Sequence, residues 1–229
     1  MTAREQLHRN GYVLLRQVIA HAWLDNLRSA FESGVKPLEQ WPVPRGPGWR
    51  HSQLDADPLI QAVCRLPHLL TTVGELIGER FFLSQVDGRD PIAGGGHQPL
   101  HRDLFGLRPG DTAGALIYLD DFGHDNGATR IVPGSHRPMP DAQPFDFDDE
   151  TQSIQLAGRA GDILVFDVGL VHAASRNFSG EPRRTLMASY RAESLYALHL
   201  ETQLLRDVRM DTGDRFEPSG EALGKMPTA

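Results

Sequence analysis

Hydrophobic positions in the first third of the chain change from helical to extended spacing and back. Residues 2–9 carry helix-forming residues and stop at Gly11. The following YVLLRQV has the β-branched and aromatic content of a short buried strand. From Ala20 to about Leu38 the apolar residues recur at helical spacing. This spacing predicts an amphipathic helix with one face on a core.

A segment rich in proline and glycine then interrupts the helical pattern. The sequence KPLEQWPVPRGPGWRH cannot continue a helix, so we expect an irregular loop over the surface. Helical spacing resumes at about Asp57 and predicts two short helices divided at Pro67. Gly78 is the predicted carboxyl-terminal stop of the second helix.

After Arg80 the pattern changes to short β-rich runs separated by glycine, proline and asparagine. The runs are FFLSQV, GALIYLDD, ATRIVP, DILVFDVGLVH and TLMASYR. Many short strands of this kind are typical of a sandwich or barrel. Helices followed by a β-rich body, with no long linker between them, predict one α+β domain over residues 1–229.

Composition and charge narrow the function classes. Of the 229 residues, 40% are hydrophobic and 23% are charged, which is ordinary for a globular protein. The net charge of −7 gives a nucleic-acid backbone no general electrostatic reason to bind. No apolar stretch approaches the roughly 20 residues that span a bilayer, and the first residues lack the apolar region of a secretory signal. The single cysteine, Cys64, is expected to be buried in a helix and cannot form an internal disulfide. Together these features predict a cytoplasmic protein without membrane or nucleic-acid partners.

The first candidate chemistry lies in QPLHRDLFG, residues 98–106. If residues 98–103 are extended, the period of two places His101 and Asp103 on one face while Arg102 points away. An imidazole and a carboxylate would then converge on one point and could chelate a metal ion. The H-x-D tripeptide is a weak signal by itself, and an ordinary turn is the alternative.

A second histidine adds a further candidate ligand. The segment GDILVFDVGLVHAASRN predicts a strongly apolar strand that ends in His172 and delivers its side chain to the rim of a barrel. A hydrogen-bonded histidine at a strand end is the alternative. Together with His101 and Asp103, His172 would complete the facial triad of non-haem iron(II), which leaves three coordination positions open.

A nearby arginine offers a cationic partner for a bound anion. Iron(II) held by two neutral imidazoles and one carboxylate keeps a charge of about +1, which favours a dianionic cosubstrate. Arg183 follows His172 by eleven residues, and a turn at NFSGEP would fold the next strand alongside the histidine strand. The guanidinium could then grip a carboxylate through two hydrogen bonds, whereas Arg184 would face the other way. An exposed strand arginine is the alternative for either residue.

Three motifs, in this order and at these spacings, resemble the phytanoyl-CoA dioxygenase family of iron(II)- and 2-oxoglutarate-dependent oxygenases. They are QPLHRD, DNGATRIVPGSH and VHAASRNFSGEPRRTL. A weaker similarity extends to GYVLLRQV and the helical part, so the resemblance covers most of the chain. It implies a double-stranded β-helix, a jelly-roll or cupin-like barrel, buttressed by helices from the N-terminal part. Asn126, Gly127 and Gly134 suit tight turns between core strands, so we expect the second motif to be architectural.

The resemblance also assigns roles to single residues. It implies that His101, Asp103 and His172 bind iron(II) and that Arg183 holds the distal carboxylate of 2-oxoglutarate. Gln85 matches a strand glutamine that touches the cosubstrate in some relatives.

Two further positions concern the substrate and the cosubstrate. Gln98 is expected near the substrate, with an exposed loop amide as the alternative. Ala174 stands where the family commonly has a polar residue, so one contact to 2-oxoglutarate is absent or supplied elsewhere. Halogenating relatives lack the carboxylate that Asp103 provides, which favours hydroxylation or a related oxidation. The implied cofactors are iron(II), 2-oxoglutarate and dioxygen, with ascorbate as an accessory reductant.

The leading expectation is a dioxygenase that hydroxylates or otherwise oxidises a small organic substrate and releases succinate and carbon dioxide. A cupin-like isomerase or hydrolase with another divalent metal is an alternative, but it has no special use for Arg183. A barrel that binds a small ligand without turnover would not need an intact triad and arginine. Loops at 39–55, 86–99, 104–112 and 137–152 are expected around the pocket mouth.

Overall fold

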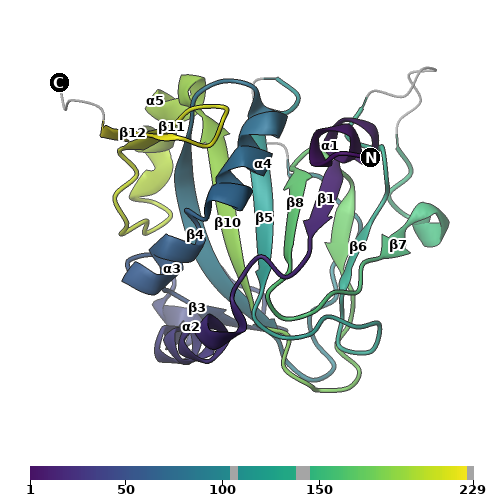
Figure 1. The fold of residues 1–229 in the computed structure, drawn as a ribbon. Coiled ribbons are helices and arrows are strands. Elements are labelled where there is room, and N and C mark those ends of the chain that lie inside the picture. The colour runs from purple at the N-terminus through teal and green to yellow at the C-terminus, as the bar shows by residue number, and fades with distance from the viewer. Residues whose placement is uncertain (104–107, 138–144, 226–229) are drawn as a thin grey trace.

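The structure is a computed structural model that describes residues 1–103, 108–137 and 145–225 (Figure 1). The helices are α1 Ala3–Asn10, α2 His21–Ser33, α3 Pro58–Val63, α4 Pro67–Ile77 and α5 Tyr196–Gln203, with short 3-10 turns at Leu38–Gln40, Glu150–Gln152 and Glu193–Leu195. The strands are β1 Tyr12–Leu15, β2 Val35–Lys36, β3 Trp49–Ser52, β4 Phe81–Pro91, β5 Thr112–Tyr118, β6 Thr129–Ile131, β7 Ile154–Gln155, β8 Ile163–Asp167, β9 His172–Ala174, β10 Thr185–Ala192, β11 Asp214–Phe216 and β12 Ala222–Lys225. None of the helices in these ranges is long and apolar enough to cross a membrane.

The strands form two antiparallel sheets that face each other as a jelly roll. The larger sheet has the order β1-β8-β5-β10-β4-β11-β12, and β3 pairs with both β4 and β2. The smaller sheet has the order β7-β6-β9. This architecture confirms the double-stranded β-helix that the sequence motifs predict.

Helices cover the outer face of the larger sheet, and Figure 1 shows α4 lying across β5 and β8. Strand β5 is buried along its whole length because both of its faces are covered. Ala115 and Ile117 belong to the core under the helices. Leu116 and Tyr118 point to the other side and pack in the barrel interior. The period of two thus divides one strand between two cores.

The helix limits follow the caps seen in the sequence. Gly11 and Gly78 end α1 and α4 with left-handed φ values of 82° and 73°, a conformation that glycine adopts without strain. Helix α2 ends at Ser33, earlier than predicted. Gly34 follows it and packs so tightly that a Cβ there would lie 2.5 Å from the carbonyl oxygen of Gln53. The chain therefore leaves the helix at this close backbone approach.

Two predicted loops contain regular structure. The segment expected as an irregular loop ends in β3, which runs along β4 with Trp49 opposite Pro91 and Ser52 opposite Gly88. Strand β4 continues to Pro91, five residues beyond the predicted FFLSQV run, so the predicted loop 86–99 begins inside the sheet. Of the predicted loops 104–112 and 137–152, residues 104–107 and 138–144 lie outside the described residues.

Candidate metal centre

The three predicted ligands are brought together by a turn that the sequence pattern hides. Strand β8 ends at Asp167, whose carboxylate accepts the Gly169 N–H at 2.8 Å. His172 then begins β9 in the smaller sheet, so the prediction of one continuous strand ending in His172 is wrong. The apolar run remains buried on both sides of the turn, which explains why hydropathy does not reveal the turn.

His101 lies directly opposite His172 on an isolated antiparallel bridge. Each backbone N–H donates to the carbonyl of the other residue at 3.0 Å. Opposed residues in such a pair point their side chains to the same face, and the two imidazole centroids are 4.5 Å apart. The Asp103 N–H donates to the Val168 carbonyl at 3.0 Å, which fixes the carboxylate beside the turn.

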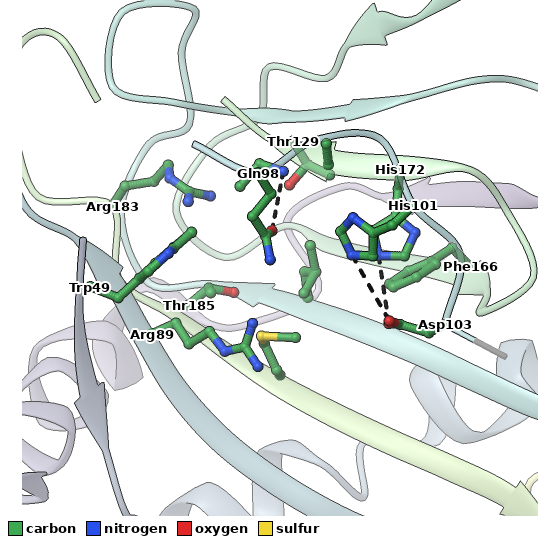
Figure 2. A pocket seen from close by; sticks show the side chains of 14 residues that line it. Trp49, Arg89, Gln98, His101, Asp103, Thr129, Phe166, His172, Arg183 and Thr185 are labelled. Carbon is green, nitrogen blue, oxygen red and sulfur yellow. Dashed lines mark hydrogen bonds and ion pairs between the residues drawn. The ribbon is translucent and has the colours of Figure 1, made fainter. Parts of the chain in front are cut away.

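The three side chains converge on one point (Figure 2). One Asp103 oxygen lies 3.9 Å from His101 Nε2, and the other lies 3.6 Å from His172 Nε2. One ligand atom from each residue lies within 4.8 Å of the other two, a grouping that could hold a metal ion.

Hydrogen bonds set both imidazoles in the form that binds a metal. Nδ1 of His101 lies 2.8 Å from the Pro99 carbonyl oxygen, and Nδ1 of His172 lies 2.8 Å from the Leu170 carbonyl oxygen. A carbonyl only accepts, so each Nδ1 carries a proton, and in the neutral ring Nε2 then has the lone pair that a metal takes. Burial also lowers the pKa of His172, which favours the neutral ring. The residues present therefore fit a divalent metal such as iron(II).

A cavity of about 210 Å³ opens beside the three ligands. Its walls come from both sheets, including β3 of the larger one. The lining residues are Trp49, Arg89, Gln98, His101, Asp103, Leu116, Thr129, Phe166, His172, Ala173, Ala174, Arg183, Thr185 and Met187. Such a mixture of apolar walls with a few converging polar groups is typical of small-molecule sites.

Arg183 lines this cavity as a buried cation. Its side chain is only 2% exposed, and its backbone N–H donates to an Asp90 oxygen at 2.9 Å. The guanidinium carbon lies 4.7 Å from the Phe122 ring centroid and 5.5 Å from that of Trp49. Among the described residues it has no ion-pair partner, and its Nε is buried without a hydrogen bond. Burial accordingly lowers the pKa of Arg183 to about 10. A carboxylate ligand would satisfy this group.

Arg184 points away from the cavity, as strand alternation predicts. Its side chain donates to Asp120 at 2.8 and 2.9 Å and to Glu32 at 3.1 Å. The predicted pairing of the next strand with the histidine strand is wrong, however. Strand β10 pairs with β4 and β5, while β9 pairs with β6. Arg183 therefore reaches the cavity from the opposite sheet.

Gln98 and Ala174 are neighbours on the cavity wall. The Gln98 N–H donates to the Ala174 carbonyl at 3.1 Å, and the Ala174 N–H donates to the Gln98 side-chain oxygen at 3.3 Å. Because the Gln98 oxygen is engaged, the amide nitrogen is the atom that Figure 2 shows pointing into the cavity. Gln98 thus presents N–H donors to a bound molecule.

Gln85, by contrast, is not brought to the cavity. It lies on β4 four residues before Arg89, which is about 13 Å along a strand. Its side-chain oxygen accepts from Arg206 at 2.7 Å. The geometry gives no support to a cosubstrate contact at this position.

Arg89 is a cavity residue that sequence reasoning missed. It shares the face of β4 on which Gln85 lies, since the two positions are an even number apart. The prediction ended this strand at Val86, before the aspartate and glycine that follow. Had the strand been extended through Asp87 and Gly88, its period of two would have pointed Arg89 at the barrel interior.

Asn126, Gly127 and Gly134 of the second motif shape turns as predicted, whereas Thr129 of the same motif lines the cavity. The Asn126 side chain accepts the Gly123 N–H at 2.7 Å and donates to the Asp121 carbonyl at 2.8 Å. Gly127 and Gly134 have φ values of 89° and 82°. These residues shape turns and do not line the cavity.

A jelly roll that places two histidines and one carboxylate beside a buried arginine is typical of one class, the mononuclear non-haem iron(II) oxygenases that use 2-oxoglutarate. Comparison with known proteins gives the same class. The sequence profile described as phytanoyl-CoA dioxygenase matches residues 7–185, and the chain belongs to this family.

Single relatives agree with the family. The dioxygenase lolE1 of Epichloe uncinata is 26% identical over 206 residues, which cover 79% of this chain and 78% of the relative. The Fe(II)/2-oxoglutarate-dependent dioxygenase nvfF of Aspergillus novofumigatus is 38% identical over 100 residues, covering 40% and 32%. Two mycobacterial proteins without an assigned function match at 30% identity, and the chain spans about half of their length, 49%.

The fold also matches solved structures. HygX from Streptomyces hygroscopicus, with nickel, 2-oxoglutarate and hygromycin B bound, superposes with a TM-score of 0.68 at 19% identity. The match covers 84% of this chain and 88% of that one. At this identity the likeness concerns the fold alone.

Proposed function

We propose that residues 1–229 act as one catalytic domain, an iron(II)- and 2-oxoglutarate-dependent dioxygenase that hydroxylates or otherwise oxidises a small organic substrate. Succinate and carbon dioxide would be the coproducts, with dioxygen as the oxidant and ascorbate as an accessory reductant. Family membership supports the class, and the site supports the assignment of residues.

One observation carries the proposal: a buried arginine without an ionic partner among the described residues lines the same cavity as the three candidate ligands. Three-residue metal sites occur in many jelly rolls with different chemistry. A buried guanidinium is costly unless an anion meets it. Its presence beside the triad favours a dicarboxylate cosubstrate that reaches from the metal to Arg183.

Each residue then has a defined task. His101, Asp103 and His172 hold iron(II), and their Nδ1 contacts keep both imidazoles oriented. Bound iron(II) would supply the activation of dioxygen that organic side chains lack. Arg183 binds the distal carboxylate of 2-oxoglutarate through its planar fork. The Gln98 amide donates to an acceptor on the substrate, and the apolar wall around Leu116 limits water at the site.

The main competing function is a cupin-like isomerase or hydrolase on the same triad. It accounts for the metal ligands but leaves the Arg183 guanidinium without a counterion. A ligand-binding barrel without turnover would not require both imidazoles to be held with Nε2 free. The geometry therefore favours the oxygenase.

Succinate formation separates these functions. Purified protein would be supplied with iron(II), ascorbate and 2-oxoglutarate, and succinate would be measured with each compound of a metabolite library. We expect that succinate formation requires iron(II) and increases when certain compounds of the library are present. Product formed from a library compound without consumption of 2-oxoglutarate would favour the isomerase or hydrolase instead.

A further inference from the structure

A second arginine in the cavity has no task in the function proposed above. Arg89 on β4 lines the cavity together with Thr185, its cross-strand neighbour on β10. Its Nε is buried without a hydrogen bond. About 25% of the side chain remains exposed. Figure 2 shows Arg89 below Thr185, with its guanidinium turned towards the side of the cavity on which the metal ligands lie.

The nearest carboxylate does not neutralise Arg89. Asp87 is the ion-pair partner among the described residues, and its oxygen is 4.0 Å from an Arg89 nitrogen. The same carboxylate oxygen lies 3.1 Å from Arg45, whose guanidinium stacks over the Trp41 ring at 4.4 Å. One aspartate thus faces two guanidinium groups, and the closer of them is Arg45.

A count of charges leaves Arg89 unbalanced when the metal and cosubstrate are bound. The two positive charges of iron(II) and the charge of Arg183 are offset by Asp103 and the two carboxylates of 2-oxoglutarate. Asp87 offsets Arg45. The positive charge of Arg89 remains, on a side chain whose pKa burial lowers. A partly buried cation of this kind favours a ligand that brings one negative charge.

We propose that Arg89 is the receptor for an anionic group of the substrate, so that the substrates are small organic anions, carboxylates foremost. The inference rests on the proposed function, because the charge count assumes iron(II) and 2-oxoglutarate in the cavity. The guanidinium fork matches the two oxygens of a carboxylate. The Gln98 amide, which also faces the cavity, supplies a second donor at a distinct position.

Binding to the anaerobic iron(II)–2-oxoglutarate complex tests this inference without turnover. A metabolite library is screened by thermal shift, and each hit is titrated by calorimetry beside its neutral amide or ester. The variants are Arg89→Met, which removes the charge, and Arg89→Lys, which keeps the charge without the fork. Arg159→Met is the matched control, since Arg159 is 76% exposed and pairs with Asp121 outside the cavity. 2-Oxoglutarate is titrated against every variant in the same buffer.

We expect the hits to be anions whose neutral counterparts bind at least about tenfold more weakly, since a charged hydrogen bond to Arg89 is lost. Arg89→Met should weaken binding of the anionic hits to the same extent, and Arg89→Lys should weaken it less. The affinity for 2-oxoglutarate should change by less than about threefold in both variants.

Two results would overturn the inference: a screen without any anionic hit, or a loss of 2-oxoglutarate affinity in Arg89→Met that matches the loss for the hits. The last result would assign Arg89 to the metal-proximal carboxylate of 2-oxoglutarate. Failure of the proposed function is distinguishable, because then the wild-type protein itself would not bind 2-oxoglutarate.

Discussion

Replacing Arg183 by alanine removes the one cation that the proposed function assigns to the distal carboxylate of 2-oxoglutarate. In the described residues this guanidinium has aromatic neighbours but no ionic partner, and only the backbone N–H of Arg183 donates to the Asp90 carboxylate. Its loss should therefore affect cosubstrate binding far more than folding.

The structure sets the expected size of the effect. Burial lowers the pKa of Arg183 from its ordinary value to about 10. At about 1.4 kcal/mol per pKa unit, the charged form is disfavoured by about 3 kcal/mol. A bound carboxylate would offset this cost. Removing one partner of a buried charge pair costs about 2–5 kcal/mol, and about 1.4 kcal/mol is tenfold in affinity. Arg183→Ala should thus weaken 2-oxoglutarate binding by about 30-fold or more.

The assay is a titration of 2-oxoglutarate into the anaerobic iron(II) protein, followed by the metal-to-ligand absorption of the complex. Iron(II) affinity should stay the same in Arg183→Ala. Arg184→Ala is the matched control, because the neighbouring guanidinium binds Asp120 and Glu32 outside the cavity. It should lower the melting temperature but change 2-oxoglutarate affinity by less than about threefold.

Two outcomes would refute the reasoning. If Arg184→Ala were the damaging change, the side-chain directions of these two residues would be reversed. If neither variant altered 2-oxoglutarate binding, the cation in the cavity would have another task, and the isomerase or hydrolase alternative would move ahead.

Three further predictions follow from the site and its supports. Wild-type protein should bind one iron(II) per chain. Alanine at any of the three proposed ligands should reduce turnover by more than the roughly 10–100-fold loss that is typical of residues that only support a ligand. Activity retained in Asp103→Ala would contradict the ligand assignment. Burial and nearby arginines lower the pKa of His199 to about 4, and its Nδ1 accepts from Arg206 at 2.9 Å. The unfolded chain takes up a proton below about pH 6.5 while folded His199 stays neutral, so stability should fall from pH 6.5 towards pH 4 by up to about 3 kcal/mol. Urea unfolding at pH 7 and pH 5 should show a smaller loss for His199→Gln than for wild type, and equal losses would exclude this histidine as a cause. Finally, a Cβ at Gly114 would lie 2.5 Å from the Phe166 ring, whose centroid is 5.2 Å from that of the His172 ring. Gly114→Ala should lower the free energy of unfolding by about 1–3 kcal/mol and weaken iron(II) binding. An unchanged melting temperature and an unchanged iron(II) affinity would show that the ring relaxes freely.

Local signals in the sequence were sufficient for much of the fold. Gly11 and Gly78 ended helices because each takes the left-handed conformation that a helix stop requires. Strand alternation separated Arg183 from Arg184 because a period of two is a property of any extended chain. The family resemblance then supplied the jelly roll, which composition alone could not distinguish from other β-rich folds.

The sequence was insufficient where burial is the same on both sides of a turn. The run from Ile163 to Ala174 is apolar apart from Asp167, Gly169 and His172, and both β8 and β9 are buried, so the overall hydropathy does not reveal the break between them. Only Gly169, bonded to the Asp167 carboxylate, marks the turn. Likewise, Arg89 follows an aspartate and a glycine that read as a loop, whereas pairing with β3 and β10 keeps this segment in the sheet. Tertiary pairing, which no local pattern records, decided both cases.

The most direct test of the central claim is release of labelled carbon dioxide from 2-oxoglutarate labelled at its first carbon. Wild-type protein and Asp103→Ala would be compared with iron(II), ascorbate and pooled library compounds in air. The oxygenase account predicts carbon dioxide release that requires iron(II), is matched by succinate, and is absent in Asp103→Ala. Release from the wild-type protein no greater than from Asp103→Ala, with iron(II) and 2-oxoglutarate both bound, would contradict it.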